Sequence, residues 1–339
     1  MDDAGGGRRG RRAERSPYLD VVLEVNWGVR CAGSKSPDLG GSSSLNLLVT
    51  DGLSQYVARI YRPLVTAERL AILQRARSHL TSYGVPTVEP IPTLSGEPWV
   101  KLEDRLVELE PFVASTHRMS DLDRVQRALP LLGRMHSGLS ELDAVSHGSA
   151  PVFSNYLPLQ DLADSVSVGT RRIRAWHPTE REAELADLAD RLMERVLDLE
   201  LRLGLRRPEQ LVHGDFWDNN VLFVGDDVVL LTDFDSLGPR PRVEDLALTL
   251  YFVSLDVDDL SRDDDRLWTL VDAYESGLDR RLAEEERQSL PIAMARQPLW
   301  SIGVWIARLD DETTARRHLA GTASALEWGW QLAEALAGR

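Results

Sequence analysis

The stretch LVHGDFWDNNVLFVGDDVVLLTDFDSLGPRPRVEDL, residues 211–246, decides the fold. Its centre contains two short apolar runs, Val221–Val224 and Val228–Thr232, which are separated by the turn residues Gly225-Asp226-Asp227. Two such runs joined by a short turn predict a β-hairpin. In a hairpin, the residue that enters the first strand lies across from the residue that leaves the second, so polar residues at the two open ends are brought together.

Polar side chains stand at that open end of the predicted hairpin. Asn220 enters the first strand and Asp233 follows the second, so we expect their Cβ atoms to lie about 5 Å apart. An amide oxygen and a carboxylate in this position can ligate Mg²⁺, which prefers oxygen ligands. Asp215 lies on the preceding loop, where it could orient a substrate hydroxyl and accept its proton during phosphoryl transfer. The alternative, an acidic surface hairpin solvated by water, is equally compatible with the crowding of carboxylates alone.

Three motifs in this stretch resemble those of the phosphotransferase enzyme family, which includes the aminoglycoside phosphotransferases (APH) and belongs to the protein-kinase-like superfamily. His213-Gly214-Asp215, followed by Asn220, matches the H-x-D-x-x-x-x-N catalytic loop of kinases. Asp233-Phe234-Asp235 stands where the family carries its metal-binding aspartate, and Glu244-Asp245-Leu246-Ala247 resembles the D-L-A that follows it. Three motifs in order and at the family's spacing make a specific signal, whereas any one of them alone would be weak.

The resemblance implies roles for five residues of this sequence. Asp215 would be the catalytic base, and Asn220 and Asp233 would bind magnesium. His213 and Asp245 would support the catalytic loop without reacting. The implied cofactors are ATP and Mg²⁺, with GTP left open as an alternative nucleotide, and the implied reaction is direct transfer to a hydroxyl group without a phosphoenzyme.

The resemblance extends upstream to residues that would bind the nucleotide. Gly40-Gly41-Ser42-Ser43-Ser44 resembles the nucleotide-positioning loop, whose small residues let backbone N–H groups approach phosphate. Ser42, Ser43 and Ser44 are therefore expected to bind the cofactor. Glu110 and Phe112 fall where the adenine-binding hinge of the family runs, and they would contact the nucleotide through their backbones.

Arg59 departs from the family pattern. Val57-Ala58-Arg59-Ile60 matches the third strand of kinases, where a lysine holds the α- and β-phosphates. Arginine supplies the charge in a bidentate fork, so we still expect Arg59 to bind the nucleotide. A glutamate of the following helix is expected to pair with this cation; the nearest position holds Gln74, and Glu68 lies closer to the start of that helix.

The chain is expected to form an α+β, protein-kinase-like fold with two lobes. Residues 18–114 predict a nucleotide-binding lobe with a small antiparallel sheet and one main helix, in the order strand, strand, strand, helix, strand, strand. Residues 115–339 predict a larger, mainly helical lobe for catalysis and substrate binding. Residues 1–17, rich in glycine and arginine, are expected to be a disordered basic tail. The signals include strands at Leu45–Val49, Gln55–Tyr61, Trp99–Leu102 and Leu106–Leu109, and helices at Thr66–Gly84, Asp121–Leu139 and Thr179–Gly204.

Composition narrows the class of protein. The 339 residues are 43% hydrophobic and carry a formal net charge of −15, which argues against a nucleic-acid partner because phosphate backbones need a basic surface. No apolar run is long enough to span a bilayer, and the first twenty residues hold no apolar stretch, so we expect neither a membrane segment nor a signal peptide. The single cysteine, Cys31, fits a reducing compartment, which predicts a cytoplasmic protein. The choice between monomer and homodimer stays open.

Three hypotheses concern the acceptor. The first, favoured by the negative charge, is an antibiotic resistance kinase that phosphorylates a hydroxyl group of a cationic aminoglycoside-like or peptide antibiotic. The second is a metabolic kinase for homoserine, choline, a sugar or a similar small alcohol. The third is a non-catalytic nucleotide-binding protein, which the intact catalytic and metal-binding residues argue against. Trp217 and Asp235 are candidate substrate contacts, and the acidic run at residues 256–265 could attract a cation, although such runs are usually solvated loops.

Overall fold

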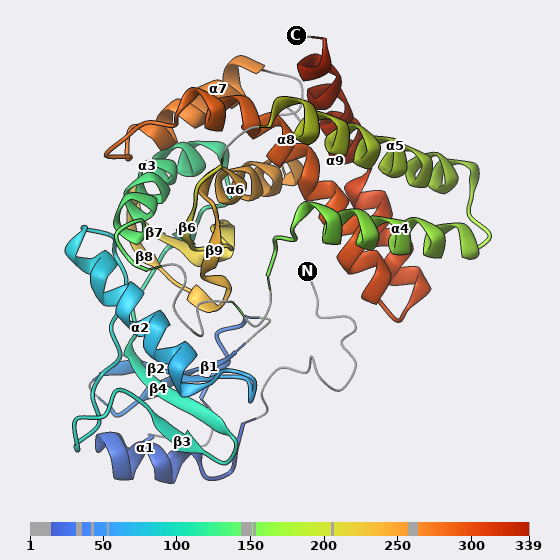
Figure 1. Cartoon of the computed structure of the whole chain (residues 1–339). Coiled ribbons are helices and arrows are strands. Elements are labelled where there is room, and N and C mark those ends of the chain that lie inside the picture. The colour runs from blue at the N-terminus through green and yellow to red at the C-terminus, as the bar shows by residue number, and fades with distance from the viewer. Residues whose placement is uncertain are drawn as a thin grey trace.

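The smaller lobe is a four-stranded antiparallel sheet with the strand order β1-β2-β4-β3. The computed structural model describes residues 15–31, 36–41, 44–52, 54–143, 151, 154–204, 207–256 and 264–338. The elements of this lobe are α1 (Leu19–Trp27), β1 (Leu45–Thr50), β2 (Gln55–Ile60), α2 (Ala67–Ser82), β3 (Val100–Leu102) and β4 (Arg105–Pro111). Figure 1 shows the sheet and its helices beside a larger, helical lobe, which confirms the predicted α+β class.

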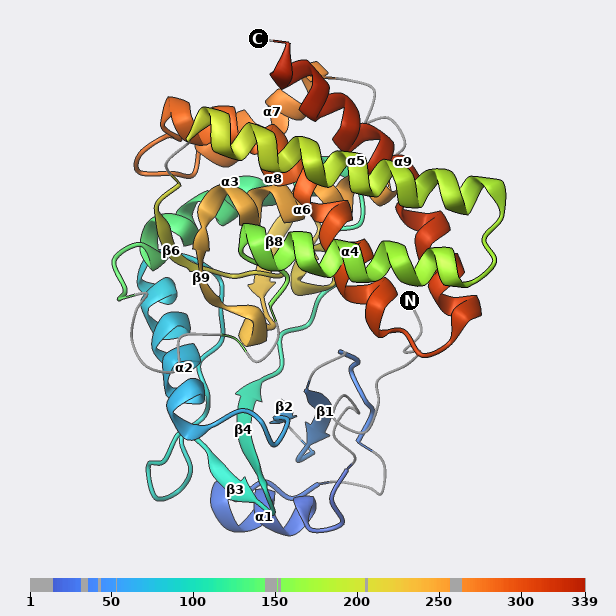
Figure 2. The same cartoon turned by 45° about the vertical axis from the view of Figure 1, so that its right-hand side comes forward.

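The larger lobe consists mainly of helices around short strands. Its helices are α3 (Leu122–Leu139), α4 (Leu159–Ala175), α5 (Glu180–Leu203), α6 (Arg242–Asp256), α7 (Asp264–Glu275), α8 (Glu284–Trp300) and α9 (Glu312–Ala337), with a π-helical turn η4 (Ser301–Ile306). Its strands are β5 (His117–Arg118), β6 (Glu209–Val212), β7 (Val221–Val224), β8 (Asp227–Leu231) and β9 (Gly238–Pro241), with 3₁₀ turns η1 (Asp218–Asn220) and η2 (Phe234–Ser236). The order β5-β7-β8 forms one small sheet, and β6 pairs with β9. Figure 2 shows α4 and α5 running side by side.

The sequence predicts three strands before the main helix of the smaller lobe, whereas the described residues form helix α1 followed by the two strands β1 and β2. Leu19, Leu23 and Trp27 recur every four residues and are buried, and the indole N–H of Trp27 donates to the carbonyl oxygen of Ile91 at 2.7 Å. Gly28 then ends the helix in the left-handed region, with φ 71°. The three valines of this segment favour a strand by propensity, but the burial of a stripe with helical spacing decides the outcome.

Two helices of the larger lobe begin where the sequence predicts. The side chain of Asp121 accepts a hydrogen bond from the N–H of Arg124 at 2.9 Å and caps α3, which continues through Pro130. The capping box at the start of α5 is confirmed, since Thr179 and Glu182 each accept a hydrogen bond from the backbone N–H of the other. Both starts follow from local side-chain chemistry and need no tertiary partner.

One hydrophobic core joins α2 to the hairpin of the larger lobe. Leu73 and Leu80 on the buried face of α2 belong to the same cluster as Leu129 on α3 and as Phe216 and Phe234, which flank β7 and β8. This core therefore fixes the hairpin β7–β8 relative to the smaller lobe.

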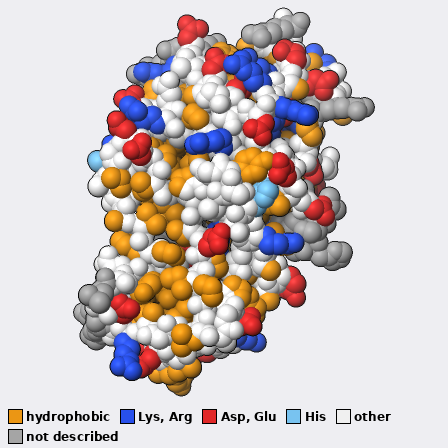
Figure 3. Space-filling model, turned by 90° about the vertical axis from the view of Figure 1, so that its left-hand side faces the viewer, with side chains coloured by type: hydrophobic (Ala, Val, Ile, Leu, Met, Phe, Trp, Pro, Cys, Tyr) orange, Lys and Arg blue, Asp and Glu red, His pale blue; other side chains and the backbone are white. Residues whose placement is uncertain are grey.

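Within the described ranges, no helix combines the length and the apolarity needed to cross a membrane. Figure 3 shows charged side chains of both signs spread over the larger lobe on one face of the molecule, and hydrophobic side chains gathered over the smaller lobe.

Candidate active site

Asp215 lies on the loop between β6 and η1, and amide groups hold its carboxylate. Nδ2 of Asn220 donates to Oδ2 of Asp215 at 3.0 Å and to its main-chain oxygen at 2.8 Å. Nδ2 of Asn155 donates to Oδ1 of Asp215 at 3.3 Å and to the carbonyl oxygen of Gly214 at 2.9 Å. Burial raises the pKa of Asp215 to about 7, and the negative charge of Asp233 adds to the shift. A carboxyl group that titrates near neutrality in a fixed orientation has the properties of a general base.

His213 is buried beneath this loop. Its Nδ1 accepts the backbone N–H of Asp215 at 3.2 Å, so Nε2 carries the proton and donates to the carbonyl oxygen of Thr232 at 3.1 Å. Its ring packs edge-on against Phe234, with ring centroids 4.7 Å apart. Burial lowers the pKa of His213 to about 4, so the imidazole is neutral near pH 7. These contacts agree with a supporting role for His213.

Asp245, at the start of α6, ties the loop to the core. Its Oδ1 accepts the N–H of Gly214 at 2.9 Å, and its Oδ2 lies 3.0 Å from Nε2 of His136, whose Nδ1 is 2.8 Å from the hydroxyl oxygen of Tyr274. Burial alone would raise the pKa of Asp245, but His136 holds that pKa below its ordinary value. Gly214 has φ +79°, and a Cβ there would lie 2.6 Å from the carbonyl oxygen of Ser236, so only glycine fits this turn.

The hairpin itself is confirmed, but its register differs from the one expected. Val221 pairs with Leu231, and the N–H of Thr232 donates to the carbonyl oxygen of Asn220 at 3.0 Å. Asn220 therefore lies across from Thr232, and Asp233 lies one residue beyond that pair. The expected pairing treated the two apolar runs as equal in length, but Val228–Thr232 is one residue longer than Val221–Val224, so Thr232 takes the place opposite Asn220.

The residues at this end of the hairpin fit a magnesium ion. Asn220 uses its Nδ2 for both hydrogen bonds to Asp215, which leaves the amide oxygen as the side that can face a cation. Asp233 is held in the left-handed region at φ 61°, and its pKa is raised by burial and by the neighbouring charge of Asp235. A cation would relieve that repulsion. Mg²⁺ is commonly held by one or two carboxylates and keeps several waters, so one carboxylate and one amide oxygen are enough to bind it.

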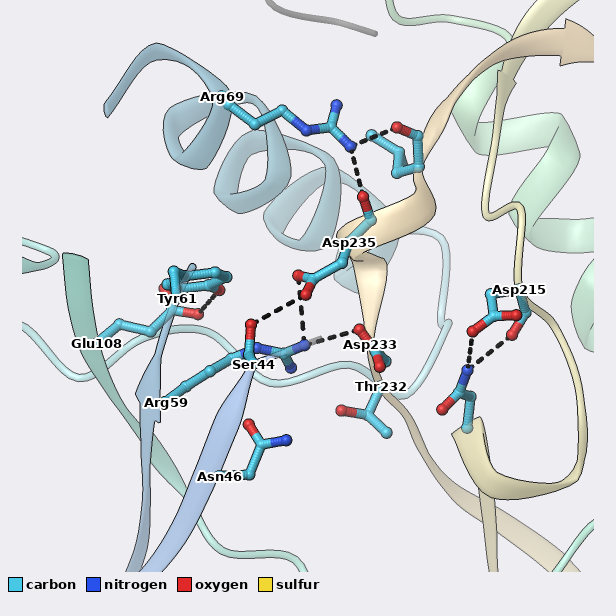
Figure 4. A network of polar contacts seen from close by, with 12 residues as sticks. Ser44, Asn46, Arg59, Tyr61, Arg69, Glu108, Asp215, Thr232, Asp233 and Asp235 are labelled. Carbon is cyan, nitrogen blue, oxygen red and sulfur yellow. Dashed lines mark hydrogen bonds and ion pairs between the residues drawn. The ribbon is translucent and has the colours of Figure 1, made fainter. Parts of the chain in front are cut away.

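Arg59 faces this acidic group from strand β2 of the smaller lobe. Its Nη2 lies 2.8 Å from Oδ1 of Asp233 and 3.4 Å from Oδ1 of Asp235. Ser44 donates its hydroxyl to Oδ2 of Asp235 at 3.0 Å, and Arg69 of α2 donates to the main-chain oxygen of Asp235 at 3.1 Å. Figure 4 shows these side chains converging on Asp235 from β1, β2 and α2. Asp235 thus contacts residues of the smaller lobe, and its expected contact with the acceptor stays a prediction.

The expected pairing of Arg59 with an acidic residue of α2 does not occur. Gln74 donates instead to Oε2 of Glu108 at 2.9 Å, and Glu68 is exposed in the first turn of α2. Helix α2 supplies a buried cation, Arg77, to two acidic residues of β4. Nη2 of Arg77 lies 2.9 and 2.8 Å from the two carboxylate oxygens of Glu108, and Nη1 pairs with Glu110. The ion pair that fixes this helix to the sheet therefore has its cation on the helix and its carboxylates on the strand.

The residues predicted to bind the nucleotide are placed as follows. Ser42 and Ser43 lie outside the described residues. Ser44 directly precedes β1, and its hydroxyl group contacts Asp235. Glu110 directs its carboxylate into the interior toward Arg77, while the N–H of Phe112 donates to the carbonyl oxygen of Gln55 at 3.1 Å and continues the sheet. A hollow of about 260 Å³ is lined by residues that include Arg59, Tyr61, Glu110, Asp233 and Asp235.

Trp217 lines a different hollow. Its ring packs against the ring of Phe252 on α6, with centroids 5.3 Å apart. Both side chains line a second hollow of about 340 Å³, together with Met119 and Thr249. Most of the acidic run at residues 256–265 lies outside the described residues.

Sequence reasoning missed three site residues. Arg77 follows the apolar stripe of α2, where a charged residue on a buried helical face signals a buried partner, and Glu108 interrupts an apolar strand in the same way. Asn155 had no local signal, because its partner Asp215 is 60 residues away in the chain.

Comparison with known proteins supports the resemblance. The model of the phosphotransferase enzyme family (APH) matches residues 36–284. A homoserine kinase of Rhodopseudomonas palustris is 26% identical over 258 residues, which cover 74% of this chain and 72% of that protein. A homoserine kinase of Zymomonas mobilis is 24% identical over 256 residues, covering 75% and 74% of the two chains.

The fold is also shared with solved kinases. The structure of a microcompartment-associated aminopropanol kinase superposes with a TM-score of 0.68 and 17% identity, covering 95% of this chain and 98% of that one. The amicoumacin kinase hAmiN, in complex with AMP-PNP, Ca²⁺ and Ami, has a TM-score of 0.65 at 13% identity, covering 93% and 92%. Because the family model matches well over half of the chain, the protein belongs to the phosphotransferase enzyme family and is a small-molecule phosphotransferase with an alcohol group as acceptor.

Proposed function

We propose that this protein transfers the γ-phosphoryl group of Mg·ATP to the hydroxyl group of a small amino alcohol. The observation that carries the proposal is the Asp215 carboxylate, which is fixed by amide groups, titrates near neutrality and lies on the loop next to Asn220 and Asp233. In a protein without catalytic activity this arrangement would only cost stability, because a raised pKa means that the ionised carboxyl group is less stable in the folded state than in the unfolded chain.

In the proposed reaction Asp215 acts on the acceptor. The acceptor oxygen forms a bond to the γ-phosphorus, the bond from that phosphorus to the β,γ-bridging oxygen breaks, and the hydroxyl proton passes to a carboxylate oxygen of Asp215. ADP leaves with the bridging oxygen, and no phosphoenzyme forms. His213 and Asp245 hold the loop through its backbone, so that Asp215 keeps its position during the transfer.

Asn220 and Asp233 would hold the magnesium ion, which when bound would neutralise charge on the phosphate oxygens. Arg59 lines the same hollow and would take the place of the lysine found in other kinases, offering two N–H groups to the phosphates. Ser44 sits where the nucleotide-positioning loop meets Asp235, and Glu110 and Phe112 mark the strand that leads into the hinge.

Homoserine is the first acceptor to test. The curated relatives at 24–26% identity that cover about three quarters of the chain are homoserine kinases. Homoserine and aminopropanol both carry a hydroxyl group and a protonated amine. Aminopropanol is a cation, which the formal net charge of −15 attracts, whereas homoserine also carries a carboxylate and is neutral overall. The same charge favours a second candidate, the phosphorylation of a cationic antibiotic, for which the amicoumacin kinase offers a precedent within the fold. We place the protein in the cytoplasm, where ATP is abundant and its single cysteine would stay reduced.

A panel assay tests this proposal. Purified protein is incubated with Mg·ATP or Mg·GTP and L-homoserine, 1-amino-2-propanol, choline, a hexose, an aminoglycoside or a peptide antibiotic, and nucleotide consumption and the phosphorylated product are measured. We expect a phosphomonoester of one amino alcohol, and we expect none from the Asp215→Asn variant. Phosphorylation only of the hexose would contradict the proposed acceptor class, and product formation by the variant would contradict the proposed base.

A further inference from the structure

The segment Ser154–Leu157, which directly precedes α4, lies against the catalytic loop. Asn155 is the point of contact. One Nδ2 atom carries two protons, and here one hydrogen bond goes to the carbonyl oxygen of Gly214 at 2.9 Å and the other to Oδ1 of Asp215 at 3.3 Å. A single amide thus joins the backbone of the loop to the carboxylate that the loop presents.

Asn155 is itself held in place by its neighbours. Leu157 offers its carbonyl oxygen to Nη2 of Arg296 at 2.6 Å, and the ring of Tyr156 lies between two guanidinium groups, 5.2 Å from Arg296 and 5.8 Å from Arg240. Both arginines are almost fully buried, with exposures of 3% and 1%. Cation–π contacts of this kind are strong when the cation is desolvated. These contacts anchor the two residues that follow Asn155, and on its other side Nη2 of Arg240 donates to Oγ of Ser154 at 3.4 Å, so the amide of Asn155 is directed at Asp215 before any substrate binds.

The two side-chain amides that donate to Asp215 differ in their other partners. Asn220 contacts Oδ2 at 3.0 Å but is also a proposed magnesium ligand, so its position would depend on the metal. Asn155 contacts the other oxygen and belongs to a segment that makes its anchoring contacts within the larger lobe. With one donor on each oxygen, the plane of the carboxylate is fixed, and rotation about the Cβ–Cγ bond would break both hydrogen bonds.

We propose that Asn155 is a positioning residue that orients the Asp215 carboxylate toward the acceptor hydroxyl. This inference rests on the proposed role of Asp215 as the base. It gives the segment before α4 a role in the reaction, although this segment lies outside the motifs of the catalytic loop. Because Asn155 contacts neither the sheet nor Arg59, its effect should fall on the transfer step and not on nucleotide binding.

Steady-state kinetics with three variants test the inference, with L-homoserine and 1-amino-2-propanol as acceptor probes. Asn155→Ala removes the donor, and we expect kcat to fall about 10- to 100-fold, as for the loss of a hydrogen bond to a charged group, with KM for Mg·ATP changed less than about twofold. Asn155→Asp puts a carboxylate beside Asp215 and the Gly214 carbonyl, so we expect a larger fall in kcat than with alanine. Gln160→Ala is the control, since it removes an exposed amide that bonds to Asp164 on α4, and its kinetics should match the unaltered protein.

The outcomes separate this inference from the proposed function. Asn155→Ala with unaltered kcat would overturn the inference while Asp215→Asn remained inactive, and the proposed function would stand. A lower melting temperature with kcat and KM changed together would assign Asn155 a merely structural role, which also overturns it. Wild-type activity in Asp215→Asn would overturn the proposed function itself. Crystals of Asn155→Ala give a readout that needs no acceptor: we expect the Asp215 carboxylate to rotate out of its present plane, and an unchanged carboxylate would contradict the inference.

Discussion

Replacement of Arg77 by methionine should lower the free energy of unfolding, because Arg77 joins helix α2 to strand β4 of the smaller lobe. Methionine keeps much of the side-chain volume but removes the charge, which leaves Glu108 and Glu110 buried without their cation. The exposed fractions of the three side chains are 4%, 0% and 5%, so water cannot take the place of the guanidinium. Tyr61 and Gln74 would still donate to Glu108, but neither carries a charge.

The expected cost follows from the burial of the pair. Removal of one partner of a buried ion pair typically destabilises a protein by about 3–5 kcal/mol, because the other partner keeps its desolvation penalty. Arg77 bonds to both oxygens of Glu108, at 2.9 and 2.8 Å, and also to Glu110, so we expect the upper part of that range. Such a loss is a large fraction of the stability of a typical domain, which is about 5–15 kcal/mol.

The loss should depend on pH in a defined direction. Burial alone would raise the pKa of Glu108, but Arg77 lowers it below its ordinary value; burial raises the pKa of Glu110. Without Arg77 both carboxyl groups would have raised pKa values, so the folded protein would bind more protons than the unfolded chain. Its stability would then fall as pH rises above the ordinary carboxyl pKa and would recover as pH drops toward it.

Urea unfolding at pH 5, 6.5 and 8, followed by tryptophan fluorescence, measures this effect. Arg75→Met on the exposed face of the same helix is the matched control and should change the free energy of unfolding by less than about 0.5 kcal/mol. A loss below about 1 kcal/mol in Arg77→Met at pH 8, or a loss that is equal at all three pH values, would refute the reasoning, because a buried, uncompensated carboxylate must cost more and must titrate.

Three further predictions concern the site. Asp233→Ala should raise the Kd of Mg·AMP-PNP about tenfold or more, since an ionic ligand of the metal is lost, and calorimetry with and without magnesium checks this. Gly214→Ala should destabilise the protein by about 2–4 kcal/mol, because its Cβ would lie 2.6 Å from the carbonyl oxygen of Ser236 at a positive φ, and urea unfolding would show a smaller loss if the loop can shift. Because Asp215 must be ionised to accept a proton and its pKa is raised to about 7, kcat/KM for the acceptor should rise with pH and level off above that value; a profile that is flat from pH 5.5 to 8.5 would count against this base.

The sequence carried enough information for the hairpin and the loop that precedes it. Two apolar runs and a glycine turn predict β7 and β8, and the spacing of Asp215, Asn220 and Asp233 follows a motif whose chemistry fixes its geometry. The register differs by one residue from the expected pairing of Asn220 with Asp233, because the second apolar run is one residue longer than the first and Thr232 takes the place opposite Asn220.

Contacts between segments that are distant in the chain could not be predicted from the sequence. The pairing of Arg77 with Glu108 and Glu110 joins a helix to a strand through the interior, and a charged residue on an apolar face shows that a partner exists without naming it. Asn155 reaches Asp215 only because two buried arginines anchor its segment, so its place depends on the packing of the whole larger lobe. The contacts of Asp235 with Ser44 and Arg59 across the lobes could not be predicted from the sequence either, because they join residues more than 170 positions apart.

The most direct test of the central claim, that Asp215 is the base of a phosphoryl transfer, combines two measurements on Asp215→Asn. With γ-labelled ATP and the acceptor found in the panel, we expect transfer to fall about 10²- to 10⁴-fold, the usual contribution of a general base. Calorimetry on the same variant should give a Kd for Mg·AMP-PNP within about twofold of the unaltered protein, because Asp215 would contact the acceptor and not the nucleotide. Transfer at the wild-type rate by a variant that still binds the nucleotide would contradict the claim.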